Sequence, residues 1–370
     1  MSLATLLSRI DHTLRPLLGN LPPRMFTHIY SATRPWFASI AANDIVQPID
    51  VPRECQRTLR NLTFRSFIGN AAGMYKQAEG YERAFAQGAG FYLAGTTTSL
   101  PRIGNKKNGI VFPFVPYPHS HGASNWLGLP NKGHAETAKI ISSFTHYPDF
   151  PIGASVSMDP GMEIHQGLQG LIKGITLYQD AGCDFIELNE SCPNVPGHSN
   201  EHSALDASLI DRLDAISRAF DLRKLPIIVK FSNDTDPNLV KPLISLLRER
   251  NFAGINLGNT STAYQKHLHV IDSRDRKHYA YFTSEYGGGL SGALVRESSL
   301  HLVSRAKSCV DEYALHDFII IGTGGIESTQ DIEQAINAGA HLMQWYTGYF
   351  ERFGIDGNDI YANVYRHVTT

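Results

Sequence analysis

Eight short, mostly apolar segments, each followed by a segment that could form a helix, restrict the fold of this chain more than any other feature. Strands buried on both faces have near-continuous apolar sequences, as in parallel sheets covered by helices. Eight of them alternating with helices predict a closed (β/α)8 TIM barrel, with a doubly wound open sheet as the alternative. Against that alternative, no GxGxxG motif opens a helix after the first strand. The predicted strands are residues 66–70, 91–94, 152–157, 184–188, 226–230, 253–257, 318–322 and 342–345.

Two connections between these strands are much longer than the others. Residues 96–133 follow the second predicted strand, and residues 258–292 follow the sixth. Long ordered insertions of this kind are usually lids or walls of a substrate site. The clearest helices between the strands are residues 79–87, 135–143, 165–180, 205–220, 239–250, 295–308 and 330–338.

The first 40 residues form a separate unit in the sequence, so we divide the chain into residues 1–40 and a barrel of residues 41–370, which begins with a connector and a short strand pair. The unit reads as an amphipathic helical hairpin with a net charge of +3. Two interpretations of this hairpin are equally compatible with its sequence. It could simply pack against the barrel, or it could act as an interfacial anchor or an apolar tunnel for a lipid-like partner. No apolar run approaches the ~20 residues that span a bilayer, and Arg9 and Asp11 interrupt any signal-peptide core. The apolar stripe of the first helix consists of Leu3, Leu6, Leu7, Ile10, Leu14, Leu17 and Leu18.

Composition narrows the class of function. With 42% hydrophobic and 18% charged residues, the chain resembles an ordinary soluble enzyme, and a net charge of −2 gives no reason to expect nucleic acid. His119 and His121 form a tight histidine pair that lacks acidic or cysteine neighbours at ligand spacing, so no metal site is expected. Four cysteines without a CxxC motif favour a reducing compartment, either the cytoplasm or the cytoplasmic face of a membrane. Nothing in the sequence favours a particular oligomeric state.

The fourth predicted strand ends in a polar loop that contains Cys192. The loop also carries Asn189, Ser191 and Asn194, and it is stiffened by two prolines. A strand that stops in amides and a thiol has the layout of an active-site loop on a rigid scaffold. A polar turn that happens to contain a cysteine is the alternative interpretation.

Glycine-containing turns follow the last two predicted strands, at residues 322–325 and 346–348. Each leads into a helix, so its backbone N–H groups could bind an anion, and barrels often bind phosphate at this position. The glycines could also serve only to permit tight turns.

Two lysines, Lys76 and Lys230, are expected to point into the mouth of the barrel. Lys230 follows an apolar run, so it should be interior rather than on the surface. Such a lysine could form a Schiff base, or it could pair with a carboxylate, a phosphate or a reduced flavin.

With these residues placed, the chain resembles the dihydroorotate dehydrogenases, flavin enzymes of pyrimidine biosynthesis. The resemblance runs from about residue 62 to about residue 348. Its seven motifs occur in the family's order. The joint match of all seven is specific for the family, whereas any one motif alone is not. They are residues 70–76, 94–98, 125–131, 188–197, 229–230, 288–292 with 259–260, and 320–326 with 346–348.

The resemblance implies a barrel that binds FMN and oxidises dihydroorotate to orotate. Cys192 matches the family's general base, and Lys230 would stabilise negative charge on the reduced flavin. The matching cofactor positions are Ala72, Gly73, Lys76, Thr96, Ser155, Asn189, Lys230, Gly258, Gly292, Gly324, Gly325, Tyr346 and Thr347. The matching substrate positions are Lys76, Asn125, Trp126, Leu127, Gly128, Leu129, Asn189, Asn194, Asn259 and Thr260.

The match combines features of two branches of the family. A cysteine base is typical of the soluble branch, which uses fumarate or NAD, whereas the quinone-using branch normally has serine. The N-terminal hairpin and residues 288–292 are similar to the quinone branch, whose helical extension forms the quinone tunnel. A quinone at the hairpin is therefore the expected acceptor, with fumarate or NAD as the alternative, and peripheral contact with a membrane is possible.

Several positions depart from the family pattern, and they bear on the substrate. We therefore keep two rival functions: a flavin oxidoreductase acting on another dihydropyrimidine, and a non-redox barrel, either a Schiff-base lyase using Lys230 or a binding protein. The departures are Tyr75 for an aspartate, Ser155 for an asparagine, Gly258 for a threonine, and Trp126, Leu129 and Pro130 in the substrate loop.

Overall fold

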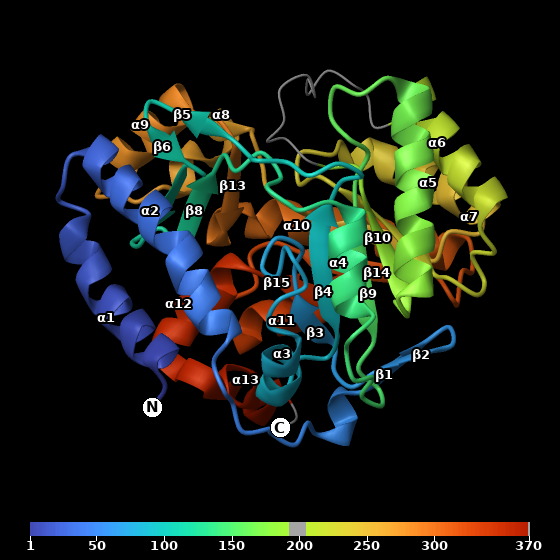
Figure 1. Cartoon of the computed structure of the whole chain (residues 1–370), viewed down its shortest axis with the longest axis horizontal. Helices are drawn as coiled ribbons and strands as arrows, with labels where there is room; N and C mark the ends of the chain where they lie inside the picture. The colour runs from blue at the N-terminus through green and yellow to red at the C-terminus, as the bar shows by residue number, and fades with distance from the viewer. Residues whose placement is uncertain (192–204, 369–370) are drawn as a thin grey trace.

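The computed structural model describes residues 1–191 and 205–368, and its centre is a barrel of eight parallel strands (Figure 1). The strand order β3-β15-β14-β12-β11-β10-β9-β4 follows the chain around the barrel. The predicted TIM barrel and its eight strands are confirmed, and only the strand ends differ. The strands are β3 (Ile68–Asn70), β4 (Tyr92–Thr97), β9 (Ile152–Val156), β10 (Phe185–Asn189), β11 (Ile227–Phe231), β12 (Gly254–Leu257), β14 (Ile319–Thr323) and β15 (Leu342–Trp345).

Helices cover the outside of the barrel, and all seven predicted barrel helices are present. Two more, α12 and α13, follow β15, where a helix was expected but no bounds were predicted. The barrel helices are α3 (Tyr81–Gln87), α4 (His134–Ile141), α5 (Ile164–Asp180), α6 (Ala207–Ala219), α7 (Val240–Glu249), α10 (Arg296–Glu312), α11 (Thr329–Ala338), α12 (Thr347–Asp356) and α13 (Ile360–Val368). Short 3₁₀ helices lie at Arg53–Cys55, Pro237–Leu239, Leu268–Val270, Ala293–Val295 and Gly357–Asp359.

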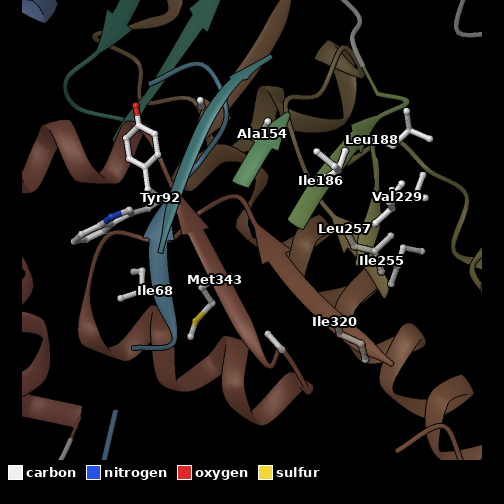
Figure 2. Close-up of a cluster of buried hydrophobic side chains, with 14 of the residues drawn as sticks. Ile68, Tyr92, Ala154, Ile186, Leu188, Val229, Ile255, Leu257, Ile320 and Met343 are labelled. Atoms are coloured by element: carbon white, nitrogen blue, oxygen red, sulfur yellow. The ribbon is translucent and has the colours of Figure 1, made fainter. Parts of the chain in front are cut away.

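Alternation along each strand separates two environments, as β10 illustrates. Ile186 and Leu188 belong to the large apolar cluster that joins the strands to the helices (Figure 2). Phe185 belongs to a second apolar cluster, and the side chain of Glu187 bonds to residues of β9, β12 and β15. Since successive side chains of a strand point to opposite faces, Phe185, Glu187 and Asn189 all face the barrel interior. The interior thus changes from apolar to polar toward the carboxyl ends of the strands.

The side chain of Asn70 joins β3 to β4, where the barrel closes. Its Nδ2 donates to the carbonyl of Leu93 at 2.7 Å, and its Oδ1 accepts from the Leu93 amide at 3.0 Å. Asn70 is 1% exposed, so both bonds are shielded from water. The Asn70 side chain therefore adds to the backbone bonds of this seam, in which the Gly90 and Gly95 amides donate to the carbonyls of Ile68 and Tyr75.

We expect Asn70→Ala to lower the free energy of unfolding by about 2–4 kcal/mol, because it leaves the buried N–H and C=O of Leu93 without partners. Urea denaturation followed by circular dichroism measures this change. Asn238→Ala, at an exposed position, is the matched control and should stay within about 0.5 kcal/mol. Equal effects of the two substitutions would contradict the role of Asn70.

The predicted N-terminal hairpin is present as α1 (Leu3–Leu18) and α2 (Pro23–Ala42) (Figure 1). Helix α1 packs along α12, where Arg15 pairs with Glu351, and α2 packs against β7. The division into residues 1–40 and 41–370 stays a prediction. In the described part of the chain, no helix combines the length and the apolar character needed to cross a bilayer.

The two long insertions meet in one small antiparallel sheet above the barrel, of order β13-β8-β7. β8 comes from the first insertion and β13 from the second, and Asn125 pairs with Gly289. This pairing fixes the predicted substrate loop against the loop after β12. The two insertions comprise β5 (Lys106–Lys107), β6 (Ile110–Val111), β7 (Phe114–Tyr117), β8 (Gly122–Asn125), α8 (Tyr264–His267), α9 (Arg276–Glu285) and β13 (Gly289–Gly292). The connector before the barrel contains the predicted strand pair, β1 (Arg57–Leu59) and β2 (Leu62–Phe64).

Candidate active site

A cavity opens at the carboxyl ends of the barrel strands, where TIM barrels carry their active sites. Residues of β4, β10 and β11 and of the segments that follow β12, β14 and β15 converge on it. The structure therefore brings together most of the residues predicted from the sequence. Those that line the cavity are Ala72, Gly73, Lys76, Thr96, Asn125, Leu127, Leu129, Asn189, Lys230, Asn259, Thr260, Gly292, Gly324, Gly325, Tyr346 and Thr347.

Four predicted residues do not line the cavity. Ser155 lies behind Thr96, with the two hydroxyl oxygens 2.8 Å apart. Trp126 packs against Tyr286, with 6.2 Å between ring centroids. Gly258 lies against the Thr323 carbonyl and Gly128 against Asn105, so they shape the walls from behind. Cys192 and Asn194 lie outside the described residues.

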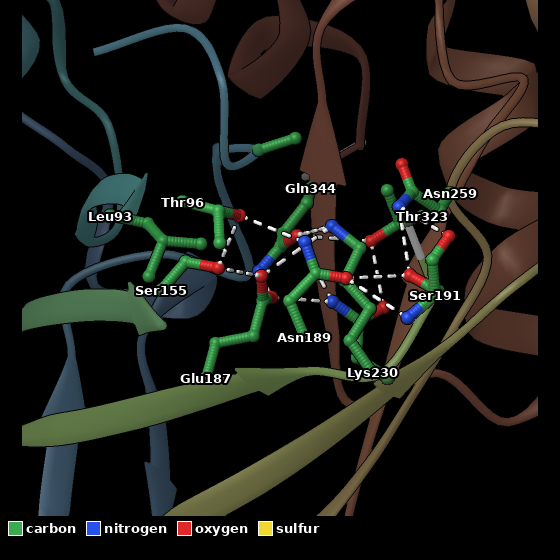
Figure 3. A network of polar contacts seen from close by, with 12 residues as sticks. Leu93, Thr96, Ser155, Glu187, Asn189, Ser191, Lys230, Asn259, Thr323 and Gln344 are labelled. Carbon is green, nitrogen blue, oxygen red and sulfur yellow. Dashed lines mark hydrogen bonds and ion pairs between the residues drawn. The ribbon is translucent and has the colours of Figure 1, made fainter. Parts of the chain in front are cut away.

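The inner end of the cavity rests on a continuous polar network across the barrel (Figure 3). Lys230 Nζ lies 3.6 Å from a carboxylate oxygen of Glu187 and 3.3 Å from Gln344 Oε1. Asn256 Nδ2 donates to both Glu187 and Gln344, at 2.8 and 3.0 Å, and Thr323 donates to Asn256 Oδ1 at 2.8 Å. These side chains come from four strands besides β10, so the network holds the polar interior in one arrangement.

Asn189 organises the start of the loop that contains Cys192. Its Nδ2 donates to Thr96 Oγ1 at 2.8 Å, and its Oδ1 accepts from the hydroxyl of Ser191 at 2.8 Å. Asn259 Nδ2 also donates to the Ser191 hydroxyl, at 2.8 Å. The residue before Cys192 is therefore held from two sides.

The N-terminus of α12 forms one wall of the cavity. Its N-cap residue, Tyr346, makes no side-chain cap, so the first amides of the helix lack that partner. The turn of Gly324 and Gly325 faces the same space, and both glycines have positive φ angles of 130° and 77°. Backbone N–H groups and the helix dipole together favour an anion here.

A second, largely apolar cavity of about 340 Å³ lies between the N-terminal hairpin and the barrel. Four residues line both cavities: Arg34, Phe114, Tyr346 and Thr347. Arg34 bonds to the hydroxyl of Tyr346, and its guanidinium lies 5.4 Å from the centre of the Phe114 ring. The two cavities are thus separated by a single layer of side chains.

Comparison with known proteins assigns this architecture to a family. The family model of dihydroorotate dehydrogenase matches residues 55–366. The chain belongs to the dihydroorotate dehydrogenase family. It is therefore an oxidoreductase with a TIM barrel, and the resemblance found in the sequence is confirmed.

Curated relatives within the dihydroorotate dehydrogenase family cover most of the chain. A protein of Marinobacter nauticus named dihydroorotate dehydrogenase (quinone) is 29% identical over 92% of this chain and 94% of its own. One of the same name from Thermus thermophilus is 26% identical over 78% of this chain and 76% of its own. The crystal structure of the Eimeria tenella DHODH with ferulenol superposes with a TM-score of 0.74 at 19% identity, covering 92% and 90% of the two chains, which shows the shared fold.

Some cavity residues of this dihydroorotate dehydrogenase family member were not predicted from the sequence. Gln344 interrupts the apolar strand β15, so a polar residue at an inward position could have revealed it. No sequence pattern indicated that Arg34 lines the cavity, because Arg34 belongs to the hairpin and reaches the cavity only where the hairpin packs on the barrel. The remaining unpredicted residues with polar side chains or aromatic rings are Phe114, Ser291, Thr323 and Trp345.

The described cysteines are poor candidates for a catalytic base. Burial raises the pKa of the Cys183 and Cys309 thiols, and it raises the pKa of Cys55 to about 11. A thiol whose pKa is raised by burial is seldom present as the reactive thiolate. Of the four cysteines, Cys192 alone follows a strand that ends at the cavity.

Proposed function

We propose that this protein oxidises dihydroorotate to orotate with bound FMN and passes the electrons to a quinone. The observation that carries the proposal is the pair of adjoining cavities. One is lined by amides, lysines and a helix N-terminus, and the other is apolar and covered by the N-terminal hairpin. The names of the relatives, dihydroorotate dehydrogenase (quinone), support the same reaction.

The residues present fit FMN. The uncapped N-terminus of α12 and the turn of Gly324 and Gly325 offer N–H donors to a phosphate. Thr96, Asn189 and Lys230 offer polar contacts to the ring system at the carboxyl ends of β4, β10 and β11. When bound, FMN supplies the two-electron chemistry that links the substrate to the acceptor.

A dihydroorotate site is supported by four polar side chains that line the first cavity. Thr260 lines the cavity, and its buried hydroxyl oxygen makes no hydrogen bond in the structure. Asn125 and Asn259 supply amides that can pair with the planar imide edge, and Lys76 supplies a positive charge for the carboxylate. The four residues come from three segments of the chain, and the small sheet joins two of them, the segment of Asn125 and that of Asn259 and Thr260.

Cys192 is proposed as the general base that takes a proton from a ring carbon of the substrate. It directly follows Ser191, whose hydroxyl is held by Asn189 and Asn259 at the cavity. A positioned base of this kind typically contributes 10²–10⁴-fold to the rate. The proposed role of Lys230 is to place positive charge next to FMN.

The second cavity is proposed to hold the quinone. Its wall is mostly apolar, as a prenylated ring requires, and Arg34 stands at the boundary with the first cavity. An exposed apolar face of the hairpin carries Leu3, Leu17 and Trp36, which are 58%, 66% and 58% exposed, and Trp36 also lines the second cavity. We propose that this face rests on a membrane surface from which the quinone enters.

The proposal is tested by anaerobic reduction of the flavin with dihydroorotate, followed by reoxidation with a short-chain quinone, fumarate and NAD in parallel. We expect reduction by dihydroorotate and rapid reoxidation by the quinone alone. Reoxidation only by fumarate or NAD would refute the acceptor. Reduction only by another dihydropyrimidine would refute the substrate, and a colourless protein that takes up no FMN would favour a non-redox barrel.

Filling the second cavity should block the quinone without affecting the substrate. Ala38 of α2 lines this cavity, so Ala38→Trp should raise the quinone KM about tenfold or more while dihydroorotate still reduces the flavin at the normal rate. Ala32→Trp, at an exposed position of the same helix, is the matched control. Equal quinone kinetics in both variants would place the quinone elsewhere.

A further inference from the structure

A buried ion pair stands behind the inner wall of the first cavity. Lys230 lines the cavity, whereas Glu187, 3.6 Å from its ammonium, does not. Both residues are 1% exposed. The sequence pattern drew attention to Lys230 alone, because Glu187 lies within a strand that otherwise reads as apolar.

The carboxylate of Glu187 is held in place from three strands. One oxygen accepts from Ser155 at 3.0 Å, and the other accepts from Asn256 and Gln344, both at 2.8 Å. Gln344 and Lys230 also bond to each other at 3.3 Å. Neither member of the ion pair can therefore move without breaking contacts to the other strands.

Stability is a weak explanation for such a pair, because removing two charges from water costs about as much as their attraction returns. An electrostatic role is better supported. Inside a protein a charge is screened far less than in water. A carboxylate fixed beside an ammonium therefore reduces the positive potential that the ammonium presents on its other side, toward the cavity.

We propose that Glu187 is a positioning residue that holds the Lys230 ammonium at the inner cavity wall and offsets part of its charge, thereby setting the midpoint potential of bound FMN. This inference rests on the proposed function, since it assumes FMN in the first cavity. Reduced FMN carries more negative charge than oxidised FMN, so it responds more strongly to the net positive charge of the pair. Glu187 thus limits how strongly the site favours reduced FMN.

The midpoint potential of FMN bound to the Glu187→Gln variant tests the proposal. The substitution removes one negative charge at nearly constant shape, so the site should favour reduced over oxidised FMN about tenfold more, a positive shift of about 30 mV for a two-electron couple. Spectroelectrochemical titration of the purified holoenzyme measures it. Asn256→Leu is the matched control, because it removes a hydrogen bond to the same carboxylate without changing charge. It should give no comparable positive shift.

Two further variants separate the electrostatic role from a structural one. Glu187→Asp retains the charge but withdraws it from Lys230, so its potential should lie between those of the wild type and Glu187→Gln. It also serves as the test if Glu187→Gln does not fold. In a Lys230→Gln background, adding Glu187→Gln should still shift the potential in the positive direction, because the same negative charge is removed whether or not the ammonium is present. An effect exerted only by positioning Lys230 would disappear in that background.

The outcomes distinguish this inference from the proposed function. Bound FMN with an unchanged or more negative potential in Glu187→Gln would refute the role of Glu187 alone. An equal shift in the Asn256→Leu control would mean that Glu187 acts through the structure of the site and not through its charge. A wild-type protein that takes up no FMN would refute both the inference and the function on which it rests.

Discussion

Replacing Cys192 by alanine should slow the reduction of bound FMN by dihydroorotate by about 10²–10⁴-fold, since this is the usual contribution of a positioned general base. Stopped-flow absorbance of the flavin under anaerobic conditions measures the rate directly. Reoxidation by a quinone does not need this base, so it should keep its normal rate in the same variant. The defect should therefore be confined to the reductive half of the reaction.

Cys183→Ala is the matched control for this experiment, because Cys183 is a buried thiol just before β10 and lies outside the proposed chemistry. The pH dependence gives a second test. A thiol acts as a base only when deprotonated, so the rate of reduction should rise with pH toward the thiol pKa, ~8.5 when unperturbed. Normal flavin reduction in Cys192→Ala would remove Cys192 from the mechanism.

Replacing Lys76 by methionine should weaken orotate binding about a hundredfold, or about 2.7 kcal/mol, because truncating one partner of a shielded charge pair typically costs 2–5 kcal/mol. The perturbation of flavin absorbance on titration with orotate reports the Kd. The methionine keeps most of the apolar stem of the lysine, so the loss isolates the charge.

Uracil, which has the same imide edge but no carboxylate, makes this experiment specific for the charge of Lys76. We expect Lys76→Met to leave uracil affinity nearly unchanged, so that the preference for orotate collapses. Lys132→Met, at an exposed position beyond the substrate loop, controls for loss of a general positive charge. If Lys76→Met weakened both ligands equally, Lys76 would act by packing rather than by charge, and a carboxylate-free substrate would gain support.

The barrel was predictable because its strands are short, apolar and regularly spaced. Burial on both faces forces that composition on each strand locally, so even β15, with Gln344 inside it, was placed at its observed bounds. A helix was expected after the turn at residues 346–348, but the bounds of α12 were not predicted, although its N-terminus carries the proposed phosphate contact. Its start is marked only by Thr347 and Gly348, without a capping side chain.

The candidate site was predictable only in part. Residues at strand ends, such as Asn189 and Lys230, had to meet once the barrel closed, because parallel strands bring their carboxyl ends to one rim. Trp126 and Gly258 were expected at the same rim but lie behind it. Which side of a loop faces the cavity depends on how that loop packs, and the loop sequence alone does not encode this.

The strands, the hairpin and the family could be predicted from the amino-acid sequence, because they follow from local burial patterns and short motifs. Which distant side chains meet could be seen only in the folded molecule. Gln344 bonds to Glu187 across 157 residues of chain, and Arg34 reaches Tyr346 across 312. Such contacts form only after the barrel has closed and the hairpin has packed on it. The physical reason is that a charge acts through its neighbours in space, and only the fold selects those neighbours.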